Sequence, residues 1–203
     1  GQICHRGLGV NRFKVTVETS GGHSWVDYGK PSAIHILADI ISQLTHLSLP
    51  RKPRSSLNVG IIQGGTTVNT IAPSAYFLLD LRAEDHNTLL RITDKARSII
   101  HSYARNGVTV ALEQIGSRPA GEIPPDHPLV QLSMDVLHTL NLSPTLEIGS
   151  TDANIPFSRG LPAVCIGLST GAGAHTAAEY IHTQPAAKGL EQLVQLVTGA
   201  YQL

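Results

Sequence analysis

Apolar and polar positions alternate over the first half of the chain in a way that predicts strands separated by helices. From Asn11 to Thr19, the apolar residues Phe13, Val15 and Val17 lie between polar neighbours, which is typical of a half-buried strand. The same pattern predicts strands at residues 57–63, 75–82 and 108–115, and helices at 31–47 and 85–105. The order β-α-β-β-α-β indicates a ferredoxin-like sandwich, with both helices on one face of an antiparallel sheet.

Particular residues mark the ends and faces of these two helices. Pro31 suits the first turn of the first helix, Asp85 supplies a cap for the second, and Asn106-Gly107 ends it. Spacing predicts an apolar face on the first helix made of Ile34, Leu37, Ala38, Ile41 and Leu44. That helix therefore has an apolar side with which to cover the sheet.

The composition changes at Gly116, where Pro and Gly become frequent and a crossing between domains is expected. Beyond it, the pattern predicts a helix capped by Asp126, a strand around Leu146, a buried strand at 163–168 and a helix at 186–201. Two short strands and two helices cannot bury both faces of a parallel sheet. We therefore expect this part of the chain to expose apolar surface. We predict an α+β chain with a complete domain at 1–115 and an incomplete α/β layer at 116–203.

Composition excludes several classes of function. The 203 residues carry no formal net charge and 4% aromatic residues, so nothing indicates nucleic-acid binding. No apolar run reaches the length of a membrane span, and no signal peptide opens the sequence. Two cysteines, Cys4 and Cys165, are too few for a disulfide framework and fit a cytoplasmic location. The start at Gly1 and the single methionine, Met134, favour a terminus made by cleavage or engineering.

The stretch from Gly149 to Tyr180 has the layout of an active-site wall. A polar cluster at 150–154 precedes the predicted strand at 163–168, and a loop of small residues at 171–174 then presents His175. Such a histidine suits a metal ligand or a general base, and the alternative is an ordinary surface histidine. Solvated or capping roles are expected for histidines on predicted helices or at their starts, namely His35, His46, His86, His101, His127 and His138.

Four further positions each have a structural and a functional interpretation. His23 follows two glycines at a strand end, where it is either a turn residue or a hydrogen-bond donor to a developing oxyanion. Asn69 is either a turn former or an amide donor to a substrate. Arg82, at a strand end, and Arg118, at the domain crossing, either pair with acidic residues or bind a carboxylate bidentately.

Five blocks of sequence, taken together, resemble one family. The blocks are GGHSWVDYGKPSAI, GGTTVNTIAPSAYFLLDLR, SRPAG, GSTDANIPFSRGLPAV and GAGAHTAAEYI. In this order and spacing they resemble the two-zinc metallopeptidases and deacylases, which include carboxypeptidase G, peptidase T, acetylornithine deacetylase, succinyl-diaminopimelate desuccinylase and aminoacylase. The resemblance spans nearly the whole chain. It implies that the first domain is the family's lid, or dimerisation, domain, and that 116–203 are the C-terminal part of its catalytic domain.

The resemblance also implies a role for individual residues. His175 matches the last zinc ligand. His23 matches the lid histidine that reaches into the partner subunit's active site and polarises the scissile carbonyl. Positions that hold the substrate, often by its carboxylate, or line its pocket match Asn69, Arg82, Arg118, Asp152, Asn154 and Gly173.

The sequence departs from the family because it has no His-x-Asp pair and no Glu-Glu pair. Members carry these residues, including the catalytic base, in an N-terminal half of the catalytic domain that has no counterpart here. The intact protein is therefore expected to be a homodimeric hydrolase of peptides or N-acyl amino acids that binds two zinc ions. This chain alone is expected to be inactive, because it lacks the base and most metal ligands. The GSTDANIP segment is closer to tripeptidase-like members.

Two other classes of protein remain open from the sequence. A stand-alone lid that acts as a dimerisation or binding module predicts a stable dimer without activity at any metal concentration. A regulatory sensor of small molecules predicts amino-acid binding at the lid interface and leaves residues 149–180 unexplained. The enzyme-fragment hypothesis predicts instead that supplying the missing half restores hydrolysis.

Overall fold

A computed structural model describes all residues from 1 to 203, which form two compact units. The ferredoxin-like unit comprises Leu8–Ala120, and the α/β unit comprises Gly1–Gly7 together with Gly121–Leu203. These bounds differ from the predicted division at residue 115. Gly1–Gly7 leaves the first unit because strand β1 (Gln2–Gly7) pairs with strands from the second half of the chain.

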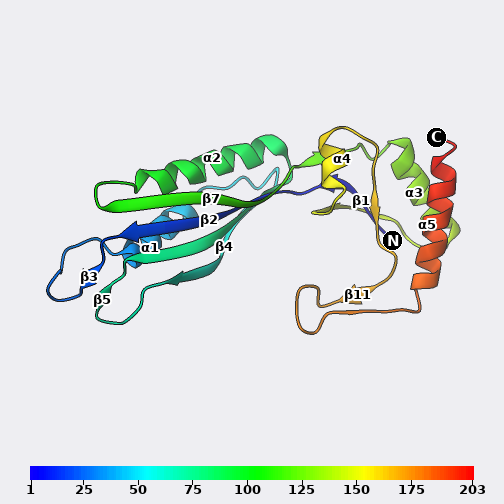
Figure 1. The fold of residues 1–203 in the computed structure, drawn as a ribbon. Coiled ribbons are helices and arrows are strands. Elements are labelled where there is room, and N and C mark those ends of the chain that lie inside the picture. The colour runs from blue at the N-terminus through cyan, green and yellow to red at the C-terminus, as the bar shows by residue number, and fades with distance from the viewer. The chain divides into compact units, whose positions relative to one another are not determined.

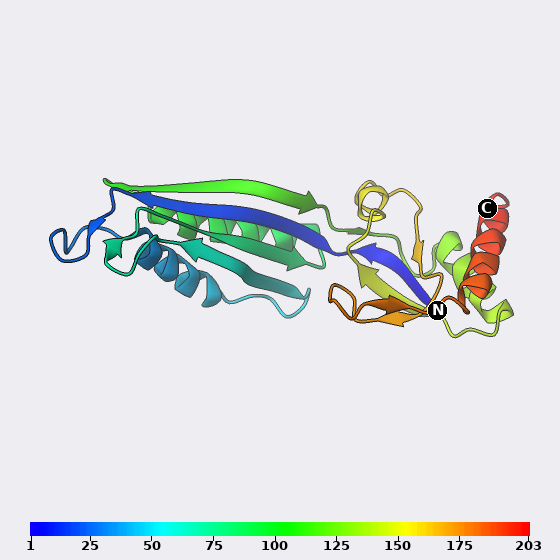
Figure 2. The ribbon, with the colours of Figure 1, turned by 60° about the horizontal axis from the view of Figure 1, so that its bottom comes forward.

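The ferredoxin-like unit has the predicted order of long strands and helices. Its strands are β2 (Gly9–Thr19), β4 (Ser55–Gly64), β6 (Ser74–Ala83) and β7 (Val108–Arg118), in the sheet order β4-β6-β2-β7. Every neighbouring pair is antiparallel. Helices α1 (Ala33–Thr45) and α2 (His86–Ser102) pack on one face of this sheet (Figure 1, Figure 2). The α+β, ferredoxin-like prediction is confirmed.

The core of this unit lies between the sheet and its helices. Alternate residues of β2 and β6, such as Phe13, Val15 and Phe77, are fully or almost fully buried there. The period of two places the polar residues of these strands on the opposite face. Asp85 caps α2 as predicted, since its side chain accepts a hydrogen bond from the Thr88 N–H at 3.0 Å.

The predicted face of α1 is partly wrong. The helix buries Ala33, Ile36, Leu37, Ile40 and Leu44, whereas Ile34 is exposed. The sequence of α1 contains two overlapping apolar sets at helical spacing, and spacing alone does not distinguish them. Packing against β2, β4 and β6 selects the set that includes Ile36 and Ile40.

Two loops extend beyond the sheet where β2 ends and β6 begins. The short strands β3 (Gly22–His23) and β5 (Thr70–Ile71) pair there, with His23 opposite Thr70 (Figure 1). We call residues 20–32 and 65–71 the tip. The opposite end of the sheet, where Val10 pairs with Arg82 and Arg118, is called the base.

The α/β unit is built around β1. Strand β9 (Thr145–Gly149) pairs with β1 in parallel, while β8 (Gly121–Glu122) and β10 (Cys165–Ile166) pair with it in antiparallel. Its helices are α3 (Pro128–Thr139), α4 (Asn154–Ser158) and α5 (Ala186–Ala200), and β11 (Gly171–Ala172) pairs with β12 (Tyr180–Ile181). None of the helices combines the length and the apolar composition that a membrane span requires.

In this unit the sequence analysis missed one strand, and two of its predictions need correction. Strand β1 was not predicted, because its apolar residues are few and lie at the start of the chain. The strand expected at 163–168 is reduced to Cys165–Ile166, which are only half-buried. Helix α3 is capped by His127 instead of Asp126, since Nδ1 of His127 accepts a hydrogen bond from the Leu129 N–H at 3.1 Å.

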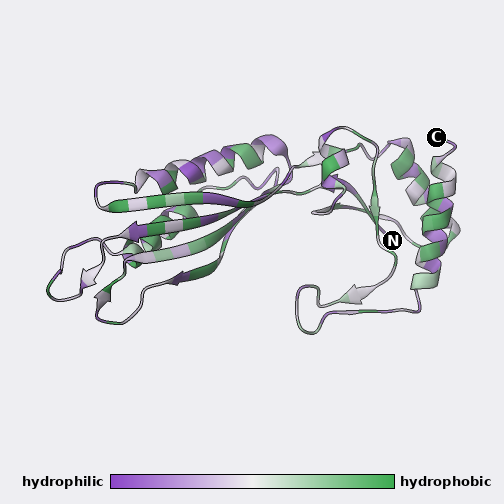
Figure 3. Ribbon diagram, in the orientation of Figure 1, coloured by the Kyte–Doolittle hydropathy of each residue, from purple (hydrophilic) through white to green (hydrophobic).

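The α/β unit exposes much apolar surface, as expected from its few elements. Its buried cluster consists of Ile123, Val130 and Phe157 with a few partly buried neighbours. Leu190, Val194 and Val197 on α5 are exposed, and Figure 3 shows apolar positions along this helix. Every residue from Thr170 to Lys188 is also exposed. A soluble unit rarely leaves so much contiguous apolar surface uncovered.

Candidate functional site

The tip brings together two of the predicted site residues, His23 and Asn69. They lie on neighbouring segments because β3 pairs with β5 and the Ser24 N–H donates to the Asn69 carbonyl at 3.0 Å. The Asn69 side-chain oxygen accepts a hydrogen bond from the Thr67 hydroxyl at 3.0 Å. Asn69 is therefore oriented by its own loop, and its amide donors are left for another group.

The tip is unusually apolar for an exposed pair of loops. Trp25, Tyr28 and Val68 are 86%, 90% and 103% exposed, and Tyr28 and Val68 line a cavity of about 470 Å³. Polar groups in the cavity wall include Lys30 and His35. Exposed aromatic residues next to polar donors are typical of a surface that contacts a partner or a ligand.

The base brings together the other two predicted residues of this unit, Arg82 and Arg118. Both pair with Val10 from opposite sides, so their backbones are about 10 Å apart, or two strand spacings. Sequence analysis missed Arg12, whose Nε donates to Asp80 at 2.8 Å. Nε of Arg82 donates to the other oxygen of Asp80 at 2.6 Å. The Arg12 and Arg82 guanidinium groups share this one carboxylate, which leaves net positive charge suited to an anionic group.

The shared carboxylate makes a testable contribution to stability. Burial alone would raise the pKa of Asp80, but hydrogen bonds from Arg82 and Arg12 outweigh it and lower this pKa below 3.8. A lowered folded-state pKa contributes stability above the unfolded value, which is lost as pH falls through the folded value. We expect Asp80→Asn to cost about 1 kcal/mol of unfolding free energy at pH 7, and less as pH falls below 4.

Urea unfolding across this pH range checks the prediction. Asp94→Asn, on the exposed side of α2, is the matched control and should change little at any pH. If the cost of Asp80→Asn is the same at pH 7 and near pH 2, the ion pairs do not supply it.

The tip and the base cannot form one site within a single copy of the ferredoxin-like unit. Strand β2 separates them, and its nine steps from Val10 to Thr19 span about 30 Å at the usual rise of a strand. His23 and Asn69 thus belong to one end of the unit and Arg82 and Arg118 to the other. A site that used both groups would need two copies of the chain.

In the α/β unit, His175 stands on the exposed turn between β11 and β12. Its backbone is in the left-handed region, with φ of 66°, which costs a non-glycine residue about 1 kcal/mol. The His175 N–H donates to the Glu179 carboxylate at 3.2 Å. Gly173 has φ of 72°, and a Cβ there would lie 2.7 Å from the Ala178 carbonyl, so only glycine fits. The loop thus holds His175 in an unusual but defined conformation.

The segment after β9 places Asp152 and Asn154 differently. Asp152 is exposed, whereas Asn154 is fully buried and its Oδ1 accepts from the Thr151 N–H at 2.9 Å. The Asn154 side chain also occupies the space that a Cβ on Gly7 would need, so it packs this segment against β1. The burial of Asn154 argues for a structural role and against direct contact with a substrate.

The residues of this chain do not make a metal site by themselves. No three His, Cys, Asp or Glu side chains come together, while a catalytic zinc ion normally has three protein ligands.

The sequence also contains a G-x-S-x-G string at residues 167–171. A nucleophile elbow needs a strand, a sharp turn and a helix, but Ser169 lies between two short strands and donates to the His182 carbonyl.

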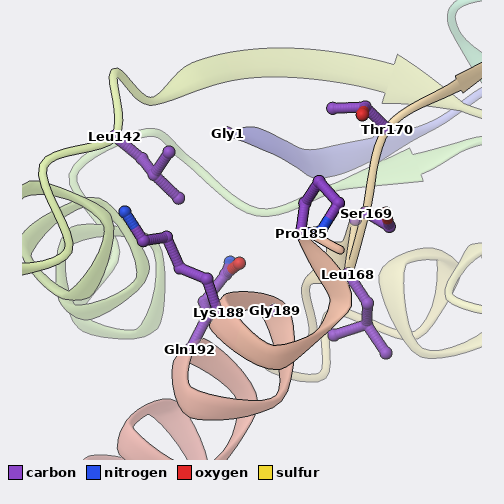
Figure 4. A pocket seen from close by; sticks show the side chains of 10 residues that line it. Gly1, Leu142, Leu168, Ser169, Thr170, Pro185, Lys188, Gly189 and Gln192 are labelled. Carbon is purple, nitrogen blue, oxygen red and sulfur yellow. The ribbon is translucent and has the colours of Figure 1, made fainter. Parts of the chain in front are cut away.

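A small cavity of about 80 Å³ lies beside the start of α5 (Figure 4). Gln192 is 2% exposed, and its Nε2 has no hydrogen-bond partner in the chain. Figure 4 shows Lys188 beside it, extending toward Leu142, and its Nζ donates to the Leu140 carbonyl at 3.0 Å. A buried amide group without a hydrogen-bond partner lowers the stability of a protein by about 1–3 kcal/mol. The Gln192 amide is therefore a group whose hydrogen bonding the chain leaves incomplete.

The four-stranded antiparallel sheet with two helices on one face defines an α+β domain of the ferredoxin-like type. The chain belongs to the peptidase dimerisation domain family, whose model matches residues 6–108, about half of the sequence. A search of curated protein sequences found no match.

Solved structures share the fold of the whole chain. A tripeptidase from Staphylococcus aureus matches with a TM-score of 0.81 and 18% identity, over 100% of this chain and 54% of its own. Aminopeptidase PepT from Bacillus cereus matches with a TM-score of 0.77 and 20% identity, over 97% and 53%. An amidase of the hydantoinase/carbamoylase family from Burkholderia vietnamiensis gives 0.73 and 16%, over 96% and 49%. The chain thus spans about half the length of these structures, and the likeness is one of fold.

Proposed function

We propose that this chain is part of a zinc-dependent amide hydrolase, a peptidase or N-acyl amino acid deacylase, and that it is inactive alone. The observation that carries the proposal is the exposed segment Thr170–Lys188, which presents His175 in a constrained turn, in a unit that leaves apolar side chains of α5 uncovered. Membership of the peptidase dimerisation domain family supports this assignment. We further propose that 121–203, with β1, is the C-terminal part of the catalytic domain.

The missing partner is the N-terminal half of that catalytic domain. Apolar side chains on α5 and the unpaired amide of Gln192 would gain partners from such a segment. His175 would be one ligand of a metal site that this second segment completes. When bound, two zinc ions would activate a water molecule for attack on an amide carbonyl. The segment would also supply the general base, for which no residue of this chain has been identified.

The residues of this chain then have distinct tasks. At the tip, the His23 ring would donate a hydrogen bond to the developing oxyanion, and Asn69 would donate to the substrate. At the base, Arg82 and Arg118 would hold a carboxylate, with Arg12 and Asp80 shaping the charge around them. Asp152 would line the substrate pocket, and Gly173 would allow the His175 loop to approach it.

The separation of about 30 Å along β2 supports a dimer in which the tip of one chain serves its partner. The tip's exposed Trp25 and Tyr28 would then be covered in the assembly. Self-association through the lid would give a two-fold interface, and the edge strands β4 and β7 are available for it. A non-catalytic dimerisation module is the alternative, and membership of the peptidase dimerisation domain family fits it as well.

The test is hydrolysis by the longer protein that carries this chain, with zinc supplied. Tripeptides and N-acyl amino acids with a free carboxylate are the substrates to try first, because of the arginines at the base. Metal-dependent turnover by the longer protein supports the proposal. A stable dimer without turnover at any zinc concentration supports the dimerisation module instead.

A further inference from the structure

The ring of His23 is fixed by its own turn. Its Nδ1 accepts hydrogen bonds from two backbone N–H groups, Trp25 at 3.2 Å and Val26 at 3.3 Å. An imidazole nitrogen accepts only when it carries no proton, so the proton of the neutral ring lies on Nε2. The turn therefore selects the tautomer whose Nε2–H can donate.

Asp27 closes this turn from the other side. Its Oδ2 accepts from the His23 backbone N–H at 2.8 Å, and its own N–H donates to the His23 carbonyl at 2.9 Å. Its Oδ1 accepts from Nζ of Lys30 at 2.8 Å. The hydrogen bond from Lys30, followed by that from the His23 N–H, lowers the pKa of the Asp27 carboxyl. Asp27 is therefore an anion at neutral pH, bonded at both oxygens.

Gly22 makes room for this carboxylate. A Cβ on Gly22 would lie 2.8 Å from Oδ2 of Asp27, and the φ of 152° is one that side chains disfavour. The sequence G-H-S-W-V-D thus encodes one compact arrangement. The glycine admits the carboxylate, the carboxylate holds the histidine backbone, and the following amides hold the ring.

We propose that Asp27 is a positioning residue that keeps His23 in the Nε2–H tautomer with this nitrogen directed away from the turn. The proposal rests on the proposed function for the use of that donor, but the turn itself is testable without any activity. Its chemistry suits a neutral donor to the carbonyl oxygen of an amide substrate. His23 would touch the substrate, and Asp27 would act only through it.

Nuclear magnetic resonance on the 203-residue chain tests the arrangement. With ¹⁵N-labelled histidine above the ordinary titration range of imidazole, the His23 signal, assigned by its loss in His23→Gln, should show an unprotonated Nδ1 and a protonated Nε2. Amide exchange of Trp25 and Val26 should be slow in the wild type. Exchange of these two amides should become about 5- to 10-fold faster in His23→Ala and in Asp27→Ala. This factor corresponds to the free energy of a typical hydrogen bond.

Controls separate this role from a general loss of structure. Asp39→Ala, on the exposed side of α1, should leave both amides protected, and Asp27→Asn should keep part of the protection because it retains an acceptor for the His23 N–H. In the longer protein, Asp27→Ala should lower kcat several-fold with little change in KM.

Two results would overturn the inference: unprotected Trp25 and Val26 amides in the wild type, or a protonated Nδ1. Neither depends on whether the protein is a hydrolase. If the turn behaves as described but His23→Ala leaves turnover by the longer protein unchanged, the arrangement of the turn stands and the role of His23 as a donor to the substrate fails. Absence of turnover in the longer protein would instead contradict the proposed function and leave the turn unaffected.

Discussion

In a longer protein that carries this chain, the proposed N-terminal half of the catalytic domain is expected to complete a zinc-dependent amide hydrolase, whereas the 203-residue chain is expected to show no turnover. The physical reason is the number of ligands. One exposed histidine cannot hold a catalytic zinc ion, and this chain brings together no cluster of metal-binding side chains. In the longer protein, His175→Ala should lower kcat/KM by about 10³-fold or more, since loss of even an outer-shell partner of a metal costs roughly 10–100-fold.

A neighbouring histidine provides the matched control for this prediction. His182 is exposed and follows β12 on the same hairpin, so His182→Ala perturbs the same loop without removing the proposed ligand. Its kcat/KM should stay within about twofold of the wild type, as for a surface substitution away from any site. Equal losses in both variants would show that the loop matters for its shape and not for a metal.

The second large effect concerns His23 and the partner subunit. In the longer protein, His23→Ala should lower kcat by about 10²–10³-fold with little change in KM, as when one donor to an oxyanion is removed. His46→Ala, at the exposed end of α1, is the control and should be neutral. A loss confined to KM would place His23 in substrate binding instead.

Mixing two inactive variants tests whether the tip acts on the partner. Random exchange of His23→Ala with His175→Ala subunits gives mixed dimers in which one site has both residues, so about one quarter of the wild-type activity should return. If each lid served its own subunit, no site in any dimer would be complete and the mixture would stay inactive. The proposed action of the tip on the partner subunit predicts recovery.

The sequence predicts the ferredoxin-like unit well because its elements carry their own signals. The alternation of Phe13, Val15 and Val17 and the cap at Asp85 are local features, and the structure confirms both. The buried face of α1 was predicted only in part, because packing against the sheet is what selects one of its two apolar sets. Local pattern is thus enough where one face of an element is polar.

The α/β unit was harder to predict because its structure depends on distant partners. Strand β1 is recognisable only through its pairing with β9, which begins more than a hundred residues later. Cys165 and Ile166 are half-buried and lie in an apolar run whose pattern predicted a longer strand. Only β1 pairs with these two residues. Spacing likewise did not reveal Arg12, which reaches Asp80 across neighbouring strands.

The residues of the candidate site fall into the same two groups: neighbours in sequence, and residues that only the fold brings together. The turn around His23 is built from adjacent residues, and the sequence showed its glycines, but its acidic partner Asp27 was identified only in the structure. The proximity of His23 to Asn69, and of Arg82 to Arg118, depends on strand register and required the structure. The burial of Asn154 also came only from the fold.

The measurement that tests the central claim most directly is the zinc content of the dialysed protein, by mass spectrometry of the metal. The account predicts far less than one zinc ion per 203-residue chain, and about two per chain in the longer protein, as in a dinuclear site. About two zinc ions in the 203-residue chain itself would contradict it. Other side chains of this chain would then form a complete site, and no missing half would be needed.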